Sequence, residues 1–151
     1  MSDAIRSLEA MVLAEIPLAR AMQLHLREYD GERLTIAAPL APNINDKGCA
    51  FGGSLVSLLT LAGWSLIVLK LRALGSACDV YVQDSTVRYL APVWDDFIAQ
   101  ARLAEGESWE TFASTLAARG RARLTVDCRV PLADGADACT LQARFVAISK
   151  P

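Results

Sequence analysis

The residues best placed to do chemistry lie in a polar turn that leads into a long apolar segment. The turn contains Asn45 and Asp46, the apolar segment opens with Gly52 and Gly53, and no charged residue occurs from Gly48 to Leu69. If this segment is a helix, its first backbone N–H groups have no partner within the helix, and glycine lets another molecule approach them closely. Any chemistry is therefore expected at the start of this segment.

The length of the apolar segment also fits a membrane span. Its interior carries four hydroxyl side chains, Ser54, Ser57, Thr60 and Ser65. In the rest of the chain, apolar and polar residues alternate as in β-strands whose apolar face must be buried against another element. The rest of the chain contains no second span. We therefore predict a helix from Gly52 to Leu74, about 35 Å long, that is buried on all sides in a soluble domain and does not cross a membrane.

The segments on either side of this helix carry strand patterns. Helical spacing predicts a first helix from Asp3 to Glu15, which ends before Pro17. Alternation predicts strands over residues 22–27, 34–36, 78–90, 97–103, 122–130 and 141–147, with a short helix over residues 109–116. Strands before and after one buried helix predict an α+β fold, in which an antiparallel sheet curls around that helix. Residues 1–151 are expected to form a single domain.

Composition and charge exclude several classes of protein. The chain is 53% hydrophobic and has a net charge of −2, so neither disorder nor nucleic-acid binding is expected. The beginning of the sequence has no signal-peptide pattern, and the four cysteines have no CxxC spacing, which predicts reduced thiols in the cytoplasm and no metal site. A cysteine nucleophile at Cys49 would need a base, and alternation turns the one histidine, His25, to the polar face of its strand.

The sequence around the polar turn resembles a known signature. The run NDKGCAFGG, residues 45–53, is similar to the N-x-x-G-x-x-H-G-G signature of the PaaI-like acyl-CoA thioesterases in the hotdog superfamily. The longer run NINDKGCAFGGSLVSLLTLAGW, followed by DSTVRYLAPVW, resembles thioesterases related to the YiiD C-terminal domain. The resemblance covers nearly the whole chain. It implies the hotdog fold, in which an antiparallel β-sheet wraps around one long central α-helix.

The resemblance also implies the hydrolysis of an acyl-CoA or acyl-carrier-protein thioester. Backbone N–H groups of Phe51, Gly52 and Gly53 would receive the developing oxyanion, helped by the helix dipole. The carboxamide of Asn45 would hold the water or the thioester, unless Asn45 is an ordinary turn residue. Asp46 would be either a base or a helix cap.

Two positions depart from the signature. PaaI-like relatives have a carboxylate seven residues after the second glycine, where this chain has Thr60, and they have a histidine where this chain has Phe51. A threonine cannot act as a carboxylate base, although it can orient a water molecule or bond to its own helix backbone. The departures indicate either a variant subfamily or a site that uses Asp46 or Asp84.

Asp84 and Ser85 interrupt a predicted strand in which most other residues are β-branched or aromatic, so they face either solvent or the site. Hotdog dimers share each active site across the interface, and the resemblance implies that this strand lines the acyl or pantetheine tunnel. Arg88 is a candidate partner for coenzyme A phosphates, as are Arg119 and Arg121, unless these are solvated charges. Trp64 would limit the depth of the acyl chain or simply pack in the core.

These considerations predict a cytoplasmic homodimer, or dimer of dimers, that hydrolyses acyl thioesters. Phe51, Trp64, Asp84, Ser85 and Arg88 would bind substrate. No cofactor is expected beyond the coenzyme A that the substrate carries. The alternative is a non-catalytic, acyl-CoA-binding or regulatory hotdog domain, which the losses at the histidine and carboxylate positions motivate.

Overall fold

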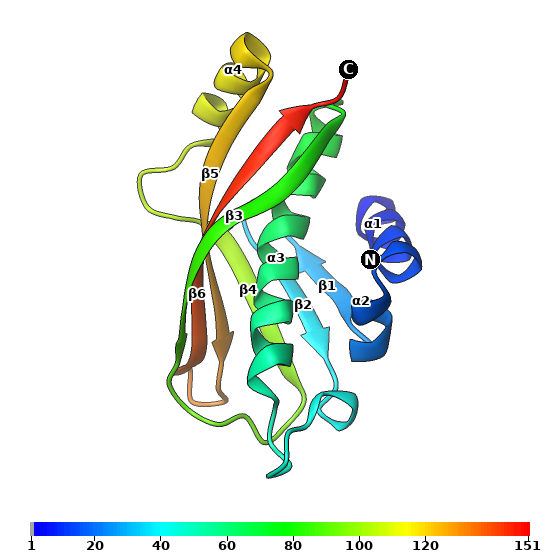
Figure 1. Ribbon diagram of the computed structural model, residues 1–151, viewed down its shortest axis with the longest axis vertical. Helices are drawn as coiled ribbons and strands as arrows, with labels where there is room; N and C mark the ends of the chain where they lie inside the picture. The colour runs from blue at the N-terminus through cyan, green and yellow to red at the C-terminus, as the bar shows by residue number, and fades with distance from the viewer. Residues whose placement is uncertain (1) are drawn as a thin grey trace.

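The computed structural model describes residues 2–151 and contains one sheet folded around one long helix (Figure 1). The helices are α1 (Asp3–Glu15), α2 (Pro17–Met22), α3 (Gly52–Ala73) and α4 (Trp109–Arg119), with a short 3-10 helix at Ala41–Asn43. The strands are β1 (His25–Tyr29), β2 (Leu34–Ala38), β3 (Cys78–Tyr89), β4 (Phe97–Leu103), β5 (Arg121–Pro131) and β6 (Asp137–Ser149). All neighbouring strands are antiparallel, in the order β1-β2-β4-β5-β6-β3.

The predicted central helix is confirmed within a residue of its predicted end. α3 lies along the concave face of the sheet and contacts β2 through β6, while α1 lies beside it (Figure 1). Its inward side is lined by fully buried side chains, among them Leu58, Leu59, Leu66 and Ile67. By length and composition α3 could cross a membrane, but more than half of its most apolar stretch is buried inside the protein, as in the core helix of a soluble domain.

The first predicted strand begins too early in the sequence. Met22 belongs to α2, and Gln23 ends that helix in the left-handed conformation at φ 56°. Pro17 ends α1, as predicted, but its fixed φ angle also suits the first turn of a new helix. The strand therefore starts at His25, and β1 and β2 form the predicted hairpin.

At Gly63, α3 packs closely against the sheet. A methyl group built there would lie 3.0 Å from two ring atoms of Phe145 and 3.3 Å from the sulfur of Cys128, both of which are buried. We expect Gly63→Ala to lower the free energy of unfolding by about 1–2 kcal/mol, because overpacking outweighs the gain in helix propensity. Urea denaturation measures this change. In the background of Phe145→Leu, Gly63→Ala should cost less than it does in the wild type, and an unchanged cost would show that the Phe145 ring is not the cause.

β3 ends the sheet on one side and differs from the other strands in burial. Most of its residues are exposed on both faces, including Tyr81, Val82 and Tyr89. A bulge at Gln83 shifts its register against β6. The bulge reverses which side chains face α3: Val82 and Ser85 lie opposite the buried Phe145 and Ala143 of β6, and residues opposite each other across a ladder point to the same face.

Candidate functional site

The polar turn before α3 is built by the side chain of Asn45. Its Oδ1 accepts hydrogen bonds from the backbone N–H groups of Lys47 at 2.8 Å and Cys49 at 3.2 Å. Its Nδ2 donates to the Cys49 sulfur at 3.2 Å, and the Asn45 backbone N–H donates to the Cys49 carbonyl at 2.8 Å. Asn45 is half-buried, so its carboxamide fixes the turn that leads to the helix.

Asn43 anchors the same segment and was missed from the sequence. It is buried, and its Nδ2 donates to the carbonyls of Met22 at 3.0 Å and Pro39 at 2.8 Å. Its own carbonyl accepts the backbone N–H of Phe51 at 2.7 Å. The predicted use of the Phe51 N–H in an oxyanion hole is therefore wrong for this structure, because that donor is already paired.

Gly52 and Gly53 form the first turn of α3, where N–H groups have no carbonyl partner within the helix. A methyl group on Gly53 would overlap the Phe51 ring, and one on Gly52 would lie 3.3 Å from the Tyr89 ring. The rings of Phe51 and Tyr89 thus flank the helix start, and both side chains are more than half exposed. Two unpaired backbone donors at a positive helix end can stabilise a negative charge placed between them.

A half-buried stripe runs along α3 from this start. Residues seven and eleven positions apart share a helix face, which aligns Gly53, Thr60 and Trp64, with Ser57 between them. Thr60 Oγ1 donates to the Val56 carbonyl at 2.8 Å, as a helix threonine without another partner does. Its oxygen can still accept a hydrogen bond from water. Ser57 was missed, although its spacing of four from Gly53 and three from Thr60 is visible in the sequence.

Trp64 joins this stripe to the edge strand. Its Nε1 donates to the Val80 carbonyl of β3 at 2.9 Å, and the side chain is half-buried. A hollow of about 380 Å³ lies beside it, between α1 and the beginning of β3, with Met11, Val68 and Tyr81 in its lining. The Trp64 side chain therefore links α3 to β3 through this hydrogen bond, and it also borders the hollow next to the stripe.

The two candidate carboxylates do not face the helix start within the protomer. Asp46 is exposed and pairs with Lys47 at 3.0 Å. The hydrogen bond and positive charge of Lys47 hold the pKa of Asp46 below its usual range, which makes this carboxylate a weak base. Asp46 is no helix cap either, because Phe51 occupies the N-cap position and makes no side-chain cap bond. Asp84 lies opposite Arg144 on the outer face of the sheet, away from α3.

The remaining predicted side chains divide between the two faces of the sheet. Ser85 faces α3, whereas Arg88 lies on the outer face opposite Thr140. Arg119 and Arg121 are exposed at the junction of α4 and β5. The structure thus brings Asn45, Phe51 and the two glycines together with the half-buried stripe of α3. It does not bring the arginines or the two aspartates to this place.

The cysteines are all free thiols. Burial raises the pKa of Cys128, and it raises the pKa of Cys139 to about 11, so both remain protonated at neutral pH. His25 is exposed on β1, as predicted. Within residues 2–151, no group of three or more His, Cys, Asp or Glu side chains is placed to hold a metal ion.

Comparisons with known proteins agree with this architecture. Residues 5–149 match the family model described as "Putative thioesterase (yiiD_Cterm)". A protein of unknown function from Chlorobaculum tepidum TLS is 26% identical, with a TM-score of 0.90 over 96% of this chain and 94% of that chain. A structure from Shewanella oneidensis, described as a "putative thioesterase", is also 26% identical, with a TM-score of 0.86 over 98% of this chain and 99% of that chain. The predicted hotdog fold is confirmed by these similarities.

Proposed function

The chain belongs to the "Putative thioesterase (yiiD_Cterm)" family, and from this premise we propose that it hydrolyses an acyl-CoA or acyl-carrier-protein thioester at the start of α3. The observation that carries the proposal is the pair of N–H groups at Gly52 and Gly53, which are unpaired within the helix and sit between two exposed aromatic rings. They would bind the thioester oxygen as it becomes an oxyanion. Losing one such donor in other enzymes lowers the rate on the order of 100- to 1000-fold.

The hydroxyl stripe on α3 supports a position for the attacking water. Thr60 lies two turns beyond Gly53 on the same face, about 10 Å along the helix, and Ser57 lies between them. We propose that these hydroxyls orient the acyl group and the water, while Asn45 fixes the turn that places the glycines. Because Asp46 and Asp84 face away within one protomer, a carboxylate base from either position would have to come from a second copy.

The edge strand supports a homodimer. β3 is twelve residues long, its outer edge has no partner strand among residues 2–151, and it carries exposed apolar side chains. A long apolar edge of this kind is a template for pairing with another chain. Two copies related by a two-fold axis would continue the sheet through β3 and cover the half-buried stripe of α3. A dimer of dimers is the second assembly that we propose. The four free thiols fit a reducing compartment such as the cytoplasm.

A second candidate is an acyl-CoA-binding domain without turnover. The observation that favours it is the lack of a suitable base at the two positions where relatives carry one: Thr60 is bonded to its own helix, and Phe51 is apolar. Thioester binding would then use the same surface. Turnover separates the two candidates, because binding alone releases no thiol.

The contribution of Asn45 can be tested against a matched turn residue. Asn45→Ala removes acceptors for two backbone N–H groups at the site, and Asp30→Ala removes the same number at the β1–β2 turn, where Asp30 accepts from Glu32 and Arg33. We expect thiol release from acyl-CoA to fall at least about 10-fold in Asn45→Ala, because a loosened turn misplaces the oxyanion donors. Asp30→Ala should keep wild-type turnover. Equal rates in both variants would show that Asn45 does not position the site.

A further inference from the structure

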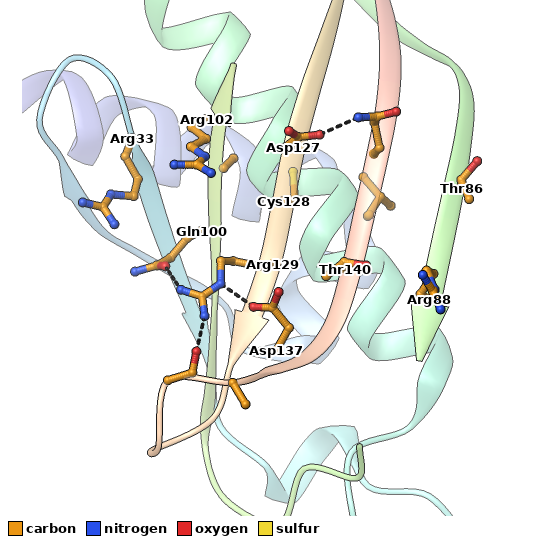
Figure 2. A pocket seen from close by; sticks show the side chains of 15 residues that line it. Arg33, Thr86, Arg88, Gln100, Arg102, Asp127, Cys128, Arg129, Asp137 and Thr140 are labelled. Atoms are coloured by element: carbon orange, nitrogen blue, oxygen red, sulfur yellow. Dashed lines mark hydrogen bonds and ion pairs between the residues drawn. The ribbon is translucent and has the colours of Figure 1, made fainter. Parts of the chain in front are cut away.

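The outer face of the sheet, on the side away from α3, contains a second and larger hollow of about 750 Å³. Figure 2 shows the residues that line it, which come from β3, β4, β5, β6, the β5–β6 turn and the turn before β2. This volume lies in the range of ligand-binding pockets. The hollow takes no part in the bond cleavage proposed at the start of α3, because the helix start lies on the opposite face of the sheet.

The hollow is organised around a fixed guanidinium. Arg129 donates to the carboxylate of Asp137, to Gln100 Oε1 at 3.3 Å and to the Gly135 carbonyl at 2.7 Å (Figure 2). Both carboxylates of the lining are already engaged, since Asp127 accepts from the Gln142 side chain at 2.8 Å. The negative charges of the hollow therefore have partners within the protein.

Three further arginines line the hollow: Arg33, Arg88 and Arg102. All three are exposed, and none makes a side-chain hydrogen bond or ion pair with any of residues 2–151. With Arg129 they give four positive charges against two negative ones. Register places Arg88, Thr140, Arg129 and Gln100 in one row across four strands, so the Cα atoms of Arg88 and Arg129 are roughly 10 Å apart.

We propose that this hollow binds a phosphate-bearing anion, such as a pyrophosphate or an organic polyphosphate. Guanidinium groups pair with phosphate through two parallel hydrogen bonds, and several of them around one hollow suit a ligand with more than one phosphate. Thr86 and Thr140 add hydroxyl donors at the same rim. The protein as a whole has a net charge of −2, so the positive charge is local to this hollow. A small anion fits that distribution, whereas a nucleic acid would need an extended basic surface.

Isothermal titration with inorganic pyrophosphate tests the proposal on the whole chain. The wild type should bind in a saturable manner, and Arg88→Gln and Arg102→Gln should each weaken binding by 10-fold or more. Arg27→Gln is the matched control, because this arginine is also exposed and makes no side-chain hydrogen bond or ion pair with any of residues 2–151, but it lies on β1, outside the hollow. Absence of binding in the wild type would overturn the proposal. So would an equal loss in Arg27→Gln, which would indicate only general charge attraction.

The phosphate can belong to coenzyme A itself or to a separate metabolite, and steady-state kinetics with acyl-CoA distinguish the two. The kinetic experiment rests on the proposed thioesterase activity, whereas the titration does not. If the hollow holds the phosphates of the substrate, Arg102→Gln raises KM for acyl-CoA and leaves kcat unchanged, and pyrophosphate competes with acyl-CoA. If the ligand is separate, KM for acyl-CoA stays at the wild-type value in Arg102→Gln while pyrophosphate binding is still lost.

Discussion

Replacing Gly53 with alanine is expected to lower thiol release on the order of 100-fold without unfolding the protein. The added methyl group would lie at the helix start, where the proposed mechanism brings the thioester oxygen to the backbone N–H groups of Gly52 and Gly53. Alanine is a better helix former than glycine by about 1 kcal/mol, so the free energy of unfolding should stay the same or rise. A fall in activity combined with unchanged or higher stability is the expected signature. Steady-state kinetics and thermal unfolding on the same preparation measure both quantities.

The Phe51 ring supplies a control for this variant. Because the methyl group would also overlap that ring, Gly53→Ala could act by displacing Phe51, which is 55% exposed and free to move. The double variant Phe51→Ala with Gly53→Ala removes the overlap. It should remain as slow as Gly53→Ala if the methyl group obstructs the donors directly. Recovery to the rate of Phe51→Ala alone would show that the ring position is what matters.

Placing a charge on the edge strand is expected to break the proposed dimer. Val82 faces the α3 side of β3 and is 46% exposed in the protomer. In a dimer paired through β3, Val82→Lys would bury two ammonium groups. Burying each ammonium group costs about 1.4 kcal/mol or more, so the two copies together raise the dimer dissociation constant at least about 100-fold. Sedimentation analysis should then find the 16.3 kDa protomer at concentrations where the wild type is dimeric. Turnover should fall with it, since the α3 stripe loses its cover.

Leu18→Lys is the matched control, because Leu18 is 54% exposed on α2, which packs against α1 and the 3-10 helix and precedes β1 at the edge of the sheet opposite β3. It should leave assembly and turnover at wild-type values. A Val82→Lys variant that stays dimeric would place the interface elsewhere. A monomeric variant with full turnover would show that the site is complete within one protomer.

Most of the fold followed from local patterns in the sequence. The uncharged run before Lys70 predicted α3, and strict alternation from Arg121 to Val130 predicted β5, because each period reflects which face is buried. Ser2 caps α1 through the backbone N–H of Ile5, as its residue type and position favour. The error at Met22 arose because a short helix of one to two turns can imitate alternation when its buried residues are few.

The candidate site was less predictable, because its geometry depends on contacts between distant segments. Alternation alone cannot place Asp84, since the bulge at Gln83 reverses the faces of β3 and is set by pairing with β6. The pairing of the Phe51 N–H with Asn43 likewise depends on how Asn43 is held by Met22 and Pro39. The residue types identified the helix start as the candidate site. Which backbone N–H groups are unpaired there could be learned only from the structure.

The most direct test of the proposed activity is thiol release by the wild type from a panel of acyl-CoAs, from short to long acyl chains and including aryl-CoAs. Binding of the same compounds should be measured in parallel by calorimetry. Saturable thiol release with at least one of them is the predicted result, and the best substrate would define the acyl group. Tight, saturable binding with no thiol release from any of them would contradict hydrolysis at the start of α3 and would leave an acyl-CoA-binding hotdog domain.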